Sequence, residues 1–311
     1  MSTGKAFEYA TAMSFYIHVN HQGGQVQIVN DIYFQNVKSS FDALGVNDKN
    51  NLMSAAMSAT LEVFNLEKNL QDMTTNLIIR IAPDSYGEIG DVRDVILTKD
   101  DWEIGVSCKH NHQALKHQRL SNRIDFGNEW AGYPVSQNYW QNVQPIFQML
   151  QTYRNGGVNW RDLPNYGISK EQDVYIPLLN TFLNEFNQLD EEHSDLATRF
   201  MEYLAGRKDF YKFVMDRNHR VVTIYCYNLH GDLGMGGAVP FVPLPTHFIS
   251  KSWKVNINGS QSTNTLIIEM NHNWTVGLRL HSAASLVETS LKFDSQPIQI
   301  PNSLLTIQIP Y

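Results

Sequence analysis

The sequence predicts an α/β protein of the α+β type, with a central mixed sheet flanked by helices and a β-rich C-terminal region. Apolar residues recur at helical spacing over residues 6–17 and 50–65, which predicts two helices. Short runs rich in Val, Ile and Leu over 77–81 and 92–97 are bounded by turn residues, as strands commonly are. From about residue 219 onward, alternating apolar and polar residues indicate successive strands.

The remaining segments complete this order of elements. Residues 103–109 form a further short apolar strand, and helical spacing returns over 111–121 and again over 175–215. We divide the 311-residue chain near residue 218, because helical patterning ends there. Residues 1–218 then form a core with helical additions and residues 219–311 form the β-rich region, although one continuous domain is an alternative.

Composition excludes several classes of protein. Hydrophobic residues make up 42% and charged residues 18% of the chain, which excludes a mainly disordered protein. No apolar run approaches the ~18 residues that a membrane-spanning helix needs, and the N-terminus lacks the pattern of a secretory signal. Cys108 and Cys226 are the two cysteines, too few for a disulfide framework or a zinc cage. We therefore expect a cytoplasmic protein with no membrane partner.

Charge is segregated along the sequence. The net charge is −7, yet residues 104–124 contain four Lys or Arg, three His and no acid. Residues 171–198 show the opposite composition, with seven acids and no Lys or Arg. Local fields rather than the average charge attract a charged ligand, so the basic segment remains a candidate for binding a polyanion.

Two charged residues stand at the ends of neighbouring predicted strands. Asp94 precedes Val95-Ile96-Leu97, and Lys109 follows the next strand, 15 residues later. A hairpin of these strands would bring both residues into one site. A metal-dependent phosphodiesterase needs a carboxylate to hold a divalent cation and a lysine to position or polarise the attacking water. This arrangement is that of the PD-(D/E)XK nuclease core.

Four longer motifs resemble the HaeIII family of type II restriction endonucleases. In chain order they are GKAFEYA, KHNHQALKHQRLS, IDFGNEWAGYP and WTVGLRLHSAASLVETSLKFD, and together they span residues 4 to 294. The resemblance implies magnesium-dependent cleavage of double-stranded DNA at the palindrome GGCC, giving 5′-phosphate ends. It also implies a homodimer, since a palindrome presents the same edges to two related sites. A cognate methyltransferase would act on the same DNA site without contacting the enzyme.

The resemblance also implies roles for individual residues. Asp94 would be the metal carboxylate and Lys109 the catalytic lysine, while Glu8 would point at the site from the first helix. Ser107 occupies the position where the superfamily usually has an acid, and a hydroxyl is a poorer ligand for a hard cation. The backbone carbonyl of Cys108 is expected to face the metal. Asp91 and Glu88 are alternatives to Asp94.

Candidate DNA contacts lie in two segments. On a helix beginning near Asn111, residues His112, Lys116 and Arg119 would share one face suited to phosphates, with Leu115 and Leu120 packed inward. Arg279 and His281 would share one face of a later strand, and an arginine can bind guanine O6 and N7 in the major groove.

Three other functions fit parts of the sequence. A DNA repair endonuclease could use the same core, and Ser107 leaves open a DNA-binding protein that has lost catalysis. A carbohydrate-binding or β-sandwich module would explain the Trp-containing strands near the C-terminus, but not residues 90–121. Incubation with plasmid DNA and magnesium separates these functions, because only a site-specific nuclease gives discrete fragments.

Overall fold

The computed structural model describes residues 3–110, 114–234 and 236–311, apart from the side chains of Glu88 and Ile89. It divides into two compact units. Unit 1 comprises Met1–Gln113, Gly206–Pro243 and Asn302–Tyr311, and unit 2 comprises Ala114–Ala205 and Leu244–Pro301.

Unit 1 is built on a mixed sheet of seven strands among its described residues. The order is β1-β2-β3-β4-β6-β7-β12. The β1–β2 and β4–β6 pairs are parallel and the other pairs antiparallel. The strands are β1 (Val26–Ile28), β2 (Leu77–Ile81), β3 (Val95–Lys99), β4 (Trp102–His110), β6 (Phe210–Asp216), β7 (Val221–Tyr227) and β12 (Thr306–Pro310).

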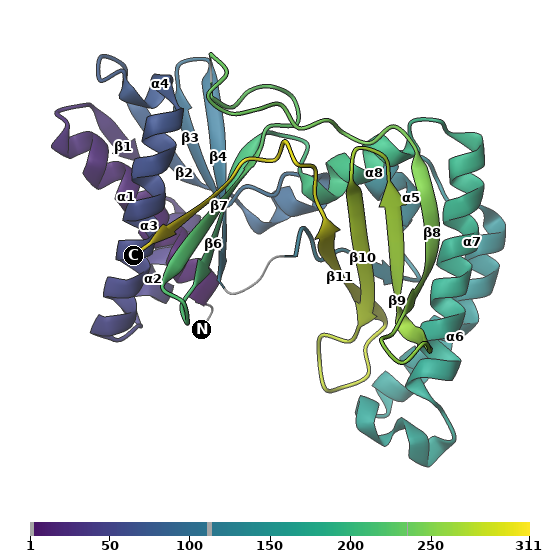
Figure 1. The fold of residues 1–311 in the computed structure, drawn as a ribbon. Helices are drawn as coiled ribbons and strands as arrows, with labels where there is room; N and C mark the ends of the chain where they lie inside the picture. Colours follow the sequence, from purple (N-terminus) through teal and green to yellow (C-terminus); the bar gives the residue numbers. More distant parts are fainter. Residues whose placement is uncertain (1–2, 111–113, 235) are drawn as a thin grey trace. The chain divides into compact units, whose positions relative to one another are not determined.

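Helices of unit 1 pack on one face of this sheet (Figure 1). They are α1 (Thr3–His21), α2 (Ile32–Asp42) and α3 (Val46–Leu66), with the short α4 (Lys68–Gln71) after them and the 3-10 helix η1 (Asp84–Ile89) between β2 and β3. Phe7 and Phe15 of α1 pack with Val106 of β4 in one continuous buried core. Alternate residues of each strand therefore point to the opposite face of the sheet, away from these helices.

Unit 2 contains an antiparallel sheet in the order β5-β11-β10-β9-β8. The strands are β5 (Arg119–Ser121), β8 (Phe248–Val255), β9 (Gln261–Met270), β10 (Trp274–His281) and β11 (Ser290–Gln299). The helical elements are α5 (Phe126–Ala131), α6 (Gln137–Asn155), the 3-10 helix η2 (Trp160–Tyr166), the π-helix η3 (Lys170–Tyr175), α7 (Ile176–Glu192) and α8 (Leu196–Ala205). An aromatic cluster joins helices to sheet, with Trp130 and Phe182 against Phe293.

The α+β class predicted from the sequence is confirmed. Residue 218, where the sequence suggested a division, lies in the turn of the β6–β7 hairpin, whose strands pair along their whole length, and the two compact units have the other bounds given above. Two details of the predicted secondary structure were wrong. Residues 210–215, which helical spacing predicted as part of a helix, lie in strand β6. Over 114–121 the chain forms no helix: an isolated bridge joins Lys116 to Ser295, and β5 follows.

The predicted inward packing of Leu115 and Leu120 is confirmed, since both are buried. Among the described residues, no helix combines the length and apolar character needed to cross a membrane.

Candidate active site

The β3–β4 hairpin brings Asp94 and Lys109 together in unit 1. Val95 lies opposite Val106 in this hairpin, which sets Asp94 beside Ser107. The backbone of Asp94 is held on both sides: its N–H donates to Val106 at 2.8 Å, and its carbonyl accepts from Ala82 at 2.9 Å. The carboxylate is therefore fixed at the end of β3, where strand β4 can reach it.

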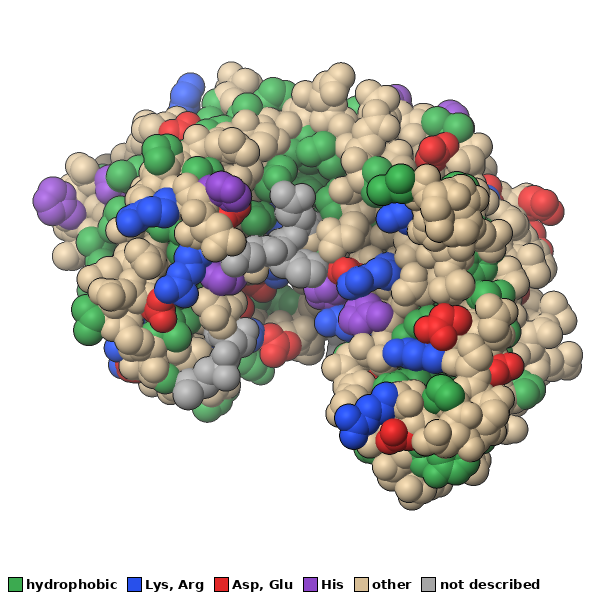
Figure 2. All heavy atoms as spheres, turned by 60° about the horizontal axis from the view of Figure 1, so that its bottom comes forward, with side chains coloured by type: hydrophobic (Ala, Val, Ile, Leu, Met, Phe, Trp, Pro, Cys, Tyr) green, Lys and Arg blue, Asp and Glu red, His purple; other side chains and the backbone are tan. Residues whose placement is uncertain are grey.

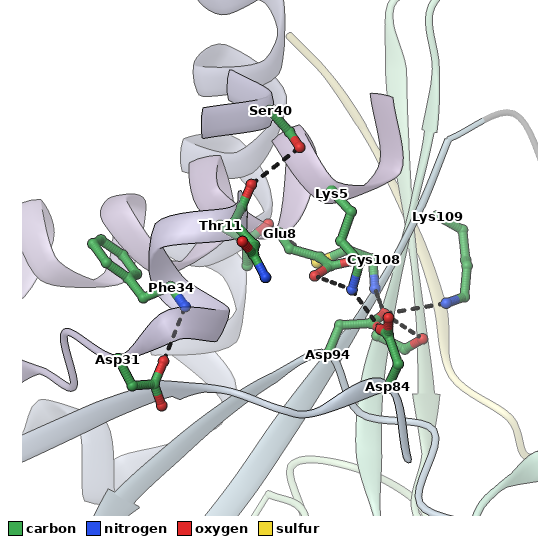
Figure 3. Close-up of polar contacts among 12 residues, drawn as sticks. Lys5, Glu8, Thr11, Asp31, Phe34, Ser40, Asp84, Asp94, Cys108 and Lys109 are labelled. Carbon is green, nitrogen blue, oxygen red and sulfur yellow. Dashed lines mark hydrogen bonds and ion pairs between the residues drawn. The ribbon is translucent and has the colours of Figure 1, made fainter. Parts of the chain in front are cut away.

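Three groups of β4 donate to one oxygen of Asp94. Lys109 Nζ and Ser107 Oγ each lie 3.1 Å from Oδ2, and the backbone N–H of Cys108 donates to it at 2.6 Å (Figure 3). Burial disfavours the charged form of Lys109, but the adjacent Asp94 carboxylate outweighs this and raises the pKa of Lys109. The lysine is therefore a cation beside a carboxylate, with its side chain 32% exposed.

Glu8 of α1 lies close to the same carboxylate and is almost completely buried. Burial, followed by the negative charge of Asp94, raises the pKa of Glu8 to about 8, although Lys5 opposes this effect. Lys5 donates to Glu8 Oε2 at 3.3 Å and to Asp84 Oδ1 at 2.6 Å. Three carboxyl groups, of Glu8, Asp84 and Asp94, thus lie near the ammonium groups of Lys5 and Lys109.

Cys108 connects β4 to α1. Its thiol donates to Thr11 Oγ1 at 3.3 Å, and burial, followed by the charge of Asp94, raises the pKa of this thiol well above its ordinary value. A buried neutral thiol of this kind packs as a small apolar group and is a poor nucleophile. Cys108 therefore contributes to the site through its backbone, whose N–H donates to Asp94.

Asp91, an alternative to Asp94, is engaged elsewhere. Its carboxylate accepts two hydrogen bonds from the Arg93 guanidinium, at 2.9 and 2.7 Å, and Arg93 also donates to Glu103 at 2.9 Å. The Arg93 side chain lies across Gly105, where a Cβ would come within 2.3 Å of it. The Arg93 side chain fills the space that a side chain at position 105 would need, which explains the glycine on β4. Because Asp91 is paired with Arg93, Asp94 is the carboxylate beside Lys109. The side chain of Glu88 is outside the described residues.

Basic residues form a row on the sheet of unit 2. In the strand register, Arg119 of β5 lies opposite Lys292 of β11, and Lys292 lies opposite His281 of β10. Paired residues of neighbouring strands share one side of a sheet, so the three side chains are neighbours. Burial, followed by the charge of Arg119, lowers the pKa of Lys292. We call these three residues the basic row.

Arg279 lies two residues before His281 on β10 and therefore shares its side of the sheet. It donates to Asp294 at 3.1 Å, and its side chain is 53% exposed. Within unit 2, on the right of Figure 2, Lys, Arg and His side chains lie near one another with acidic side chains among them.

Comparison with known proteins gives a match over nearly the whole chain. The family described as "HaeIII restriction endonuclease" matches residues 4–301. The chain belongs to this family. A relative from Haemophilus aegyptius, described as "Type II restriction enzyme HaeIII", is 33% identical over 318 residues, which cover 99% of this chain and 97% of the relative. No solved structure gives a significant match. The protein is thus a HaeIII-type endonuclease, a type II site-specific deoxyribonuclease.

Type II restriction enzymes generally use a divalent metal ion, and the carboxylates of this endonuclease fit one. Asp94 and Glu8 lie close together, and the protein would offer these two carboxylates to the ion. Among the described residues no group of three or more His, Cys, Asp and Glu side chains is placed to hold a metal. Magnesium is commonly held by one or two carboxylates, with water and substrate phosphate as its other ligands. A cation between Asp94 and Glu8 would also relieve the repulsion that raises the pKa of Glu8.

The structure brings together most of the site residues predicted in the endonuclease. Asp94, Lys109, Ser107 and Cys108 are in contact, and Glu8 lies beside them. Sequence reasoning missed Lys5, although its spacing from Glu8 on a helix was a usable signal. It also missed Asp84, which accepts a hydrogen bond from Lys5, and Lys292, which strand pairing places beside Arg119.

Lys116 and Arg119, two of the predicted DNA contacts of the endonuclease, are placed differently from the expectation. Asn111 and His112 lie outside the described residues. Lys116 Nζ lies 3.5 Å from the centroid of the Tyr203 ring, and Arg119 donates to the Ser290 carbonyl at 2.9 Å. Lys116 and Arg119 therefore do not share a helix face, since the segment is extended; Arg119 belongs to the basic row instead.

Proposed function

We propose that the endonuclease cuts both strands of DNA at GGCC in a magnesium-dependent reaction. The observation that supports this most strongly is the contact of Lys109 with Asp94 beside Glu8, in a member of the HaeIII family. The sequence GGCC follows from the motif resemblance. Water would attack phosphorus, the P–O3′ bond would break, and the products would carry 5′-phosphate and 3′-hydroxyl ends.

Each residue of the site has a proposed task. Asp94 and Glu8 would hold magnesium, with the Cys108 carbonyl as a further ligand; when bound, magnesium supplies positive charge at the phosphate and lowers the pKa of a water. Lys109 orients the attacking water and stabilises negative charge that develops on the phosphate oxygens. Ser107 donates to Asp94 and so keeps its carboxylate oriented, in place of a second acid.

DNA would be held by the basic row and by Arg279. Lysine and arginine bind phosphates without regard to sequence, so Arg119 and Lys292 would supply affinity. Arg279 is an exposed arginine held in place by Asp294, and such a side chain can donate to guanine O6 and N7. His281 shares this side of the sheet and would contact phosphate or a base edge. We also propose that Lys116 contacts a phosphate of the DNA.

We also propose that the endonuclease is a homodimer of the cytoplasm. A homodimer would place two identical sites on a palindrome, and a cognate methyltransferase would protect the same sequence in the host DNA. We place the enzyme in the cytoplasm, where the host DNA lies and where the free cysteines Cys108 and Cys226, both buried, stay reduced.

Digestion of plasmid DNA with magnesium tests this function. We expect discrete fragments whose ends map to GGCC and accept ligation as 5′-phosphates. Fragment ends at another sequence would overturn the proposed specificity. Random nicking would favour a repair endonuclease, and a mobility shift without any cleavage would favour a DNA-binding protein that has lost catalysis.

A further inference from the structure

Unit 2 contains a cavity of about 880 Å³ at the end of the sheet where strand β10 stops. Its lining comes from two segments that are far apart in the sequence. Residues 159–171 include η2 and the start of η3, and residues 282–285 begin the β10–β11 loop. Ser282 of this loop directly follows His281 of the basic row. The cavity is therefore next to a residue that we propose contacts DNA.

Backbone hydrogen bonds hold the two segments of the lining together. The Trp160 N–H donates to the Ser285 carbonyl, and the Val287 N–H donates to the Val158 carbonyl, each at 2.9 Å. An isolated bridge joins residues 159 and 286 between them. The walls of the cavity are thus fixed to one another before any ligand binds.

Lys170 lines the cavity and is held in place by neutral groups. Its ammonium donates to Ser282 Oγ at 2.9 Å, and it lies 4.8 Å from the centroid of the Trp160 ring and 5.2 Å from that of Tyr175. The Tyr175 hydroxyl in turn accepts from the N–H of Ser282 at 3.1 Å. Aromatic rings attract an ammonium group without neutralising its charge. An ammonium has three N–H donors and Ser282 accepts from one, so Lys170 can still donate to a ligand in the cavity.

Lys251 of unit 2 shows what a different arrangement of the same groups looks like. It too lies on aromatic rings, 4.6 Å from the centroid of Phe248 and 5.8 Å from that of Phe186, but its ammonium is paired with the Asp190 carboxylate. In the described part of the chain, no carboxylate forms an ion pair with Lys170. The charge of Lys251 is therefore neutralised within the protein, whereas that of Lys170 is directed at the cavity.

The charge of the lining favours an anion. Two cations, Arg161 and Lys170, line the cavity with one acid, Glu171, which gives these described residues a net charge of +1. The Arg161 side chain is 85% exposed, and its 3.6 Å contact with Asp162 is a surface ion pair of a kind that contributes little. A single phosphate group therefore matches the cavity better than a cation or an apolar ligand does.

The position of the cavity along β10 indicates which phosphate could reach it. Ser282 follows Arg279 by three residues, which is roughly 10 Å of extended chain. Two base pairs of a duplex occupy only about 7 Å along its axis. A phosphate in the cavity would therefore lie beyond the two base pairs that Arg279 would read.

We propose that this cavity binds a phosphate of the DNA backbone outside the GGCC sequence, through the Lys170 ammonium and the Ser282 hydroxyl. This inference rests on the proposed function. A half-site of two base pairs offers few contacts, so a phosphate bound beyond it would supply affinity that the bases cannot. Such a contact carries no sequence information and would fix the position of the duplex on the sheet of unit 2.

The test measures whether Lys170 and one flanking phosphate depend on each other in binding. GGCC duplexes carry a single neutral methylphosphonate, placed in turn at each phosphate within the site and on both sides of it. Their affinity is measured with metal removed by chelation, for native enzyme, Lys170→Met and Lys251→Met. Lys251→Met is the matched control, since it also removes a lysine that lies on aromatic rings in unit 2.

The native enzyme and Lys251→Met should lose about tenfold affinity when the methylphosphonate replaces one phosphate outside GGCC, as expected for one charge-assisted contact. Lys170→Met should lose less than about twofold at that position and keep the native response at the others. On unmodified DNA it should bind about tenfold more weakly, and its slope of log K against log salt should be flatter by about 0.9.

Three results would overturn the inference. The first is a native response of Lys170→Met at every flanking phosphate, and the second is a native enzyme that responds to no phosphate outside GGCC. The third is failure of both Lys170→Met and Lys170→Gln to fold, judged by thermal unfolding, which would show a structural role. Lys170→Gln keeps a hydrogen-bond donor for Ser282 without the charge and is tested in the same way.

The plasmid digestion described above separates this inference from the proposed function. If the native enzyme cuts at GGCC while Lys170→Met keeps the native methylphosphonate response, the proposed function stands and this inference alone is wrong. If the native enzyme binds the duplexes but does not cut DNA, the proposed function is wrong, and the response of Lys170→Met still decides whether the cavity binds a flanking phosphate.

Discussion

Asp94 and Lys109 form an ion pair with a 3.1 Å contact across the ends of β3 and β4, although 15 residues separate them in the chain. Removing either side chain should abolish cleavage while DNA binding survives. Lys109→Ala and Asp94→Asn should each lower the cleavage rate by about 10³-fold or more, because we propose that both side chains act at the reacting phosphate. Single-turnover cleavage measures this loss, and a mobility shift measures binding.

Asparagine is preferred to alanine at position 94 for a structural reason. The Cys108 N–H donates to Asp94 Oδ2, and a buried donor without an acceptor costs about 1–3 kcal/mol. Asp94→Asn keeps an oxygen for this bond, so its thermal unfolding should stay near that of the native enzyme. Cleavage at the native rate in either Lys109→Ala or Asp94→Asn would show that the motif has been assigned wrongly.

Glu8→Gln should weaken metal binding as well as cleavage. The substitution keeps the size of the side chain but removes a negative charge next to Asp94, where a cation would bind. We expect the affinity for Mn²⁺, a spectroscopic substitute for magnesium, to fall by about tenfold or more. Titration followed by electron paramagnetic resonance measures this affinity. Unchanged Mn²⁺ affinity would exclude Glu8 as a ligand and leave Ser107 without a compensating acid.

The basic row should contribute to DNA affinity through phosphates. Each phosphate contact adds about −0.9 to the slope of log K against log salt, so the Arg119→Ala/Lys292→Ala double variant should flatten the slope by roughly 1.8 for any DNA sequence. Fluorescence anisotropy over a range of salt concentrations measures the slope. Lys254→Ala, at an exposed lysine of β8 at the other edge of the sheet, is the control and should keep the native slope. A native slope in the double variant would remove the basic row from the DNA interface.

The contact of Asp94 with Lys109 in the β3–β4 hairpin could be predicted because its information is local. Asp94, two short strands and Lys109 follow one another in the sequence, and a single turn determines how they meet. The pairing of β6 with β4, which sets Lys212 opposite Ser107, could not be predicted in the same way, since β6 comes from a distant part of the chain and nothing in the sequence states this register. The raised pKa of Glu8 likewise depends on burial that only the packed structure defines.

The error over residues 114–121 has the same physical origin. Leu115 and Leu120 suggested a buried helical stripe, and both are buried, but as parts of an extended segment. Leu115 N–H donates to Ser295 at 2.8 Å, and Leu120 pairs with Leu291 of β11. Long-range pairing with β11 therefore overrides the local spacing, and it places Arg119 beside Lys292 rather than on one face with Lys116.

Stability should depend on pH through Glu67, which is fully buried in unit 1. Tyr211 and the N–H of Gly234 both donate to Oε1, at 2.5 and 2.8 Å, but burial outweighs these bonds and raises the pKa of Glu67. The folded state thus holds a proton that the unfolded state releases near the ordinary pKa of 4.5. Glu67 therefore favours folding less as the pH rises from that value through its folded pKa.

Glu67→Gln should accordingly reduce the fall in unfolding temperature between pH 5 and pH 9, because its amide does not titrate. The comparison is the difference between variant and native enzyme at each pH, measured by differential scanning calorimetry. Glu62→Gln, at a half-exposed glutamate of α3, is the control and should follow the native curve. Parallel curves for Glu67→Gln and native enzyme would show that Glu67 is ionised in the folded state throughout.

The last prediction concerns assembly on DNA. GGCC is a palindrome, so both strands present the same groups, and two identical subunits related by a two-fold axis would each need to read two adjacent G·C pairs. A few donors such as Arg279 suffice for that task. The acidic stretch over 171–198 carries seven acids and no Lys or Arg, so it would repel DNA and confine binding to the basic surfaces.

Sedimentation of the endonuclease with a GGCC duplex should therefore show two protein chains per duplex. A matched duplex of the same length with the site changed to GCGC should not support this complex at the same protein concentration. Arg279→Ala should lower the preference for GGCC over GCGC by about tenfold, since one arginine–guanine contact discriminates by ~1–3 kcal/mol. A single chain on DNA that nicks one strand per encounter would exclude the dimer, and unchanged preference in Arg279→Ala would assign base reading to another residue.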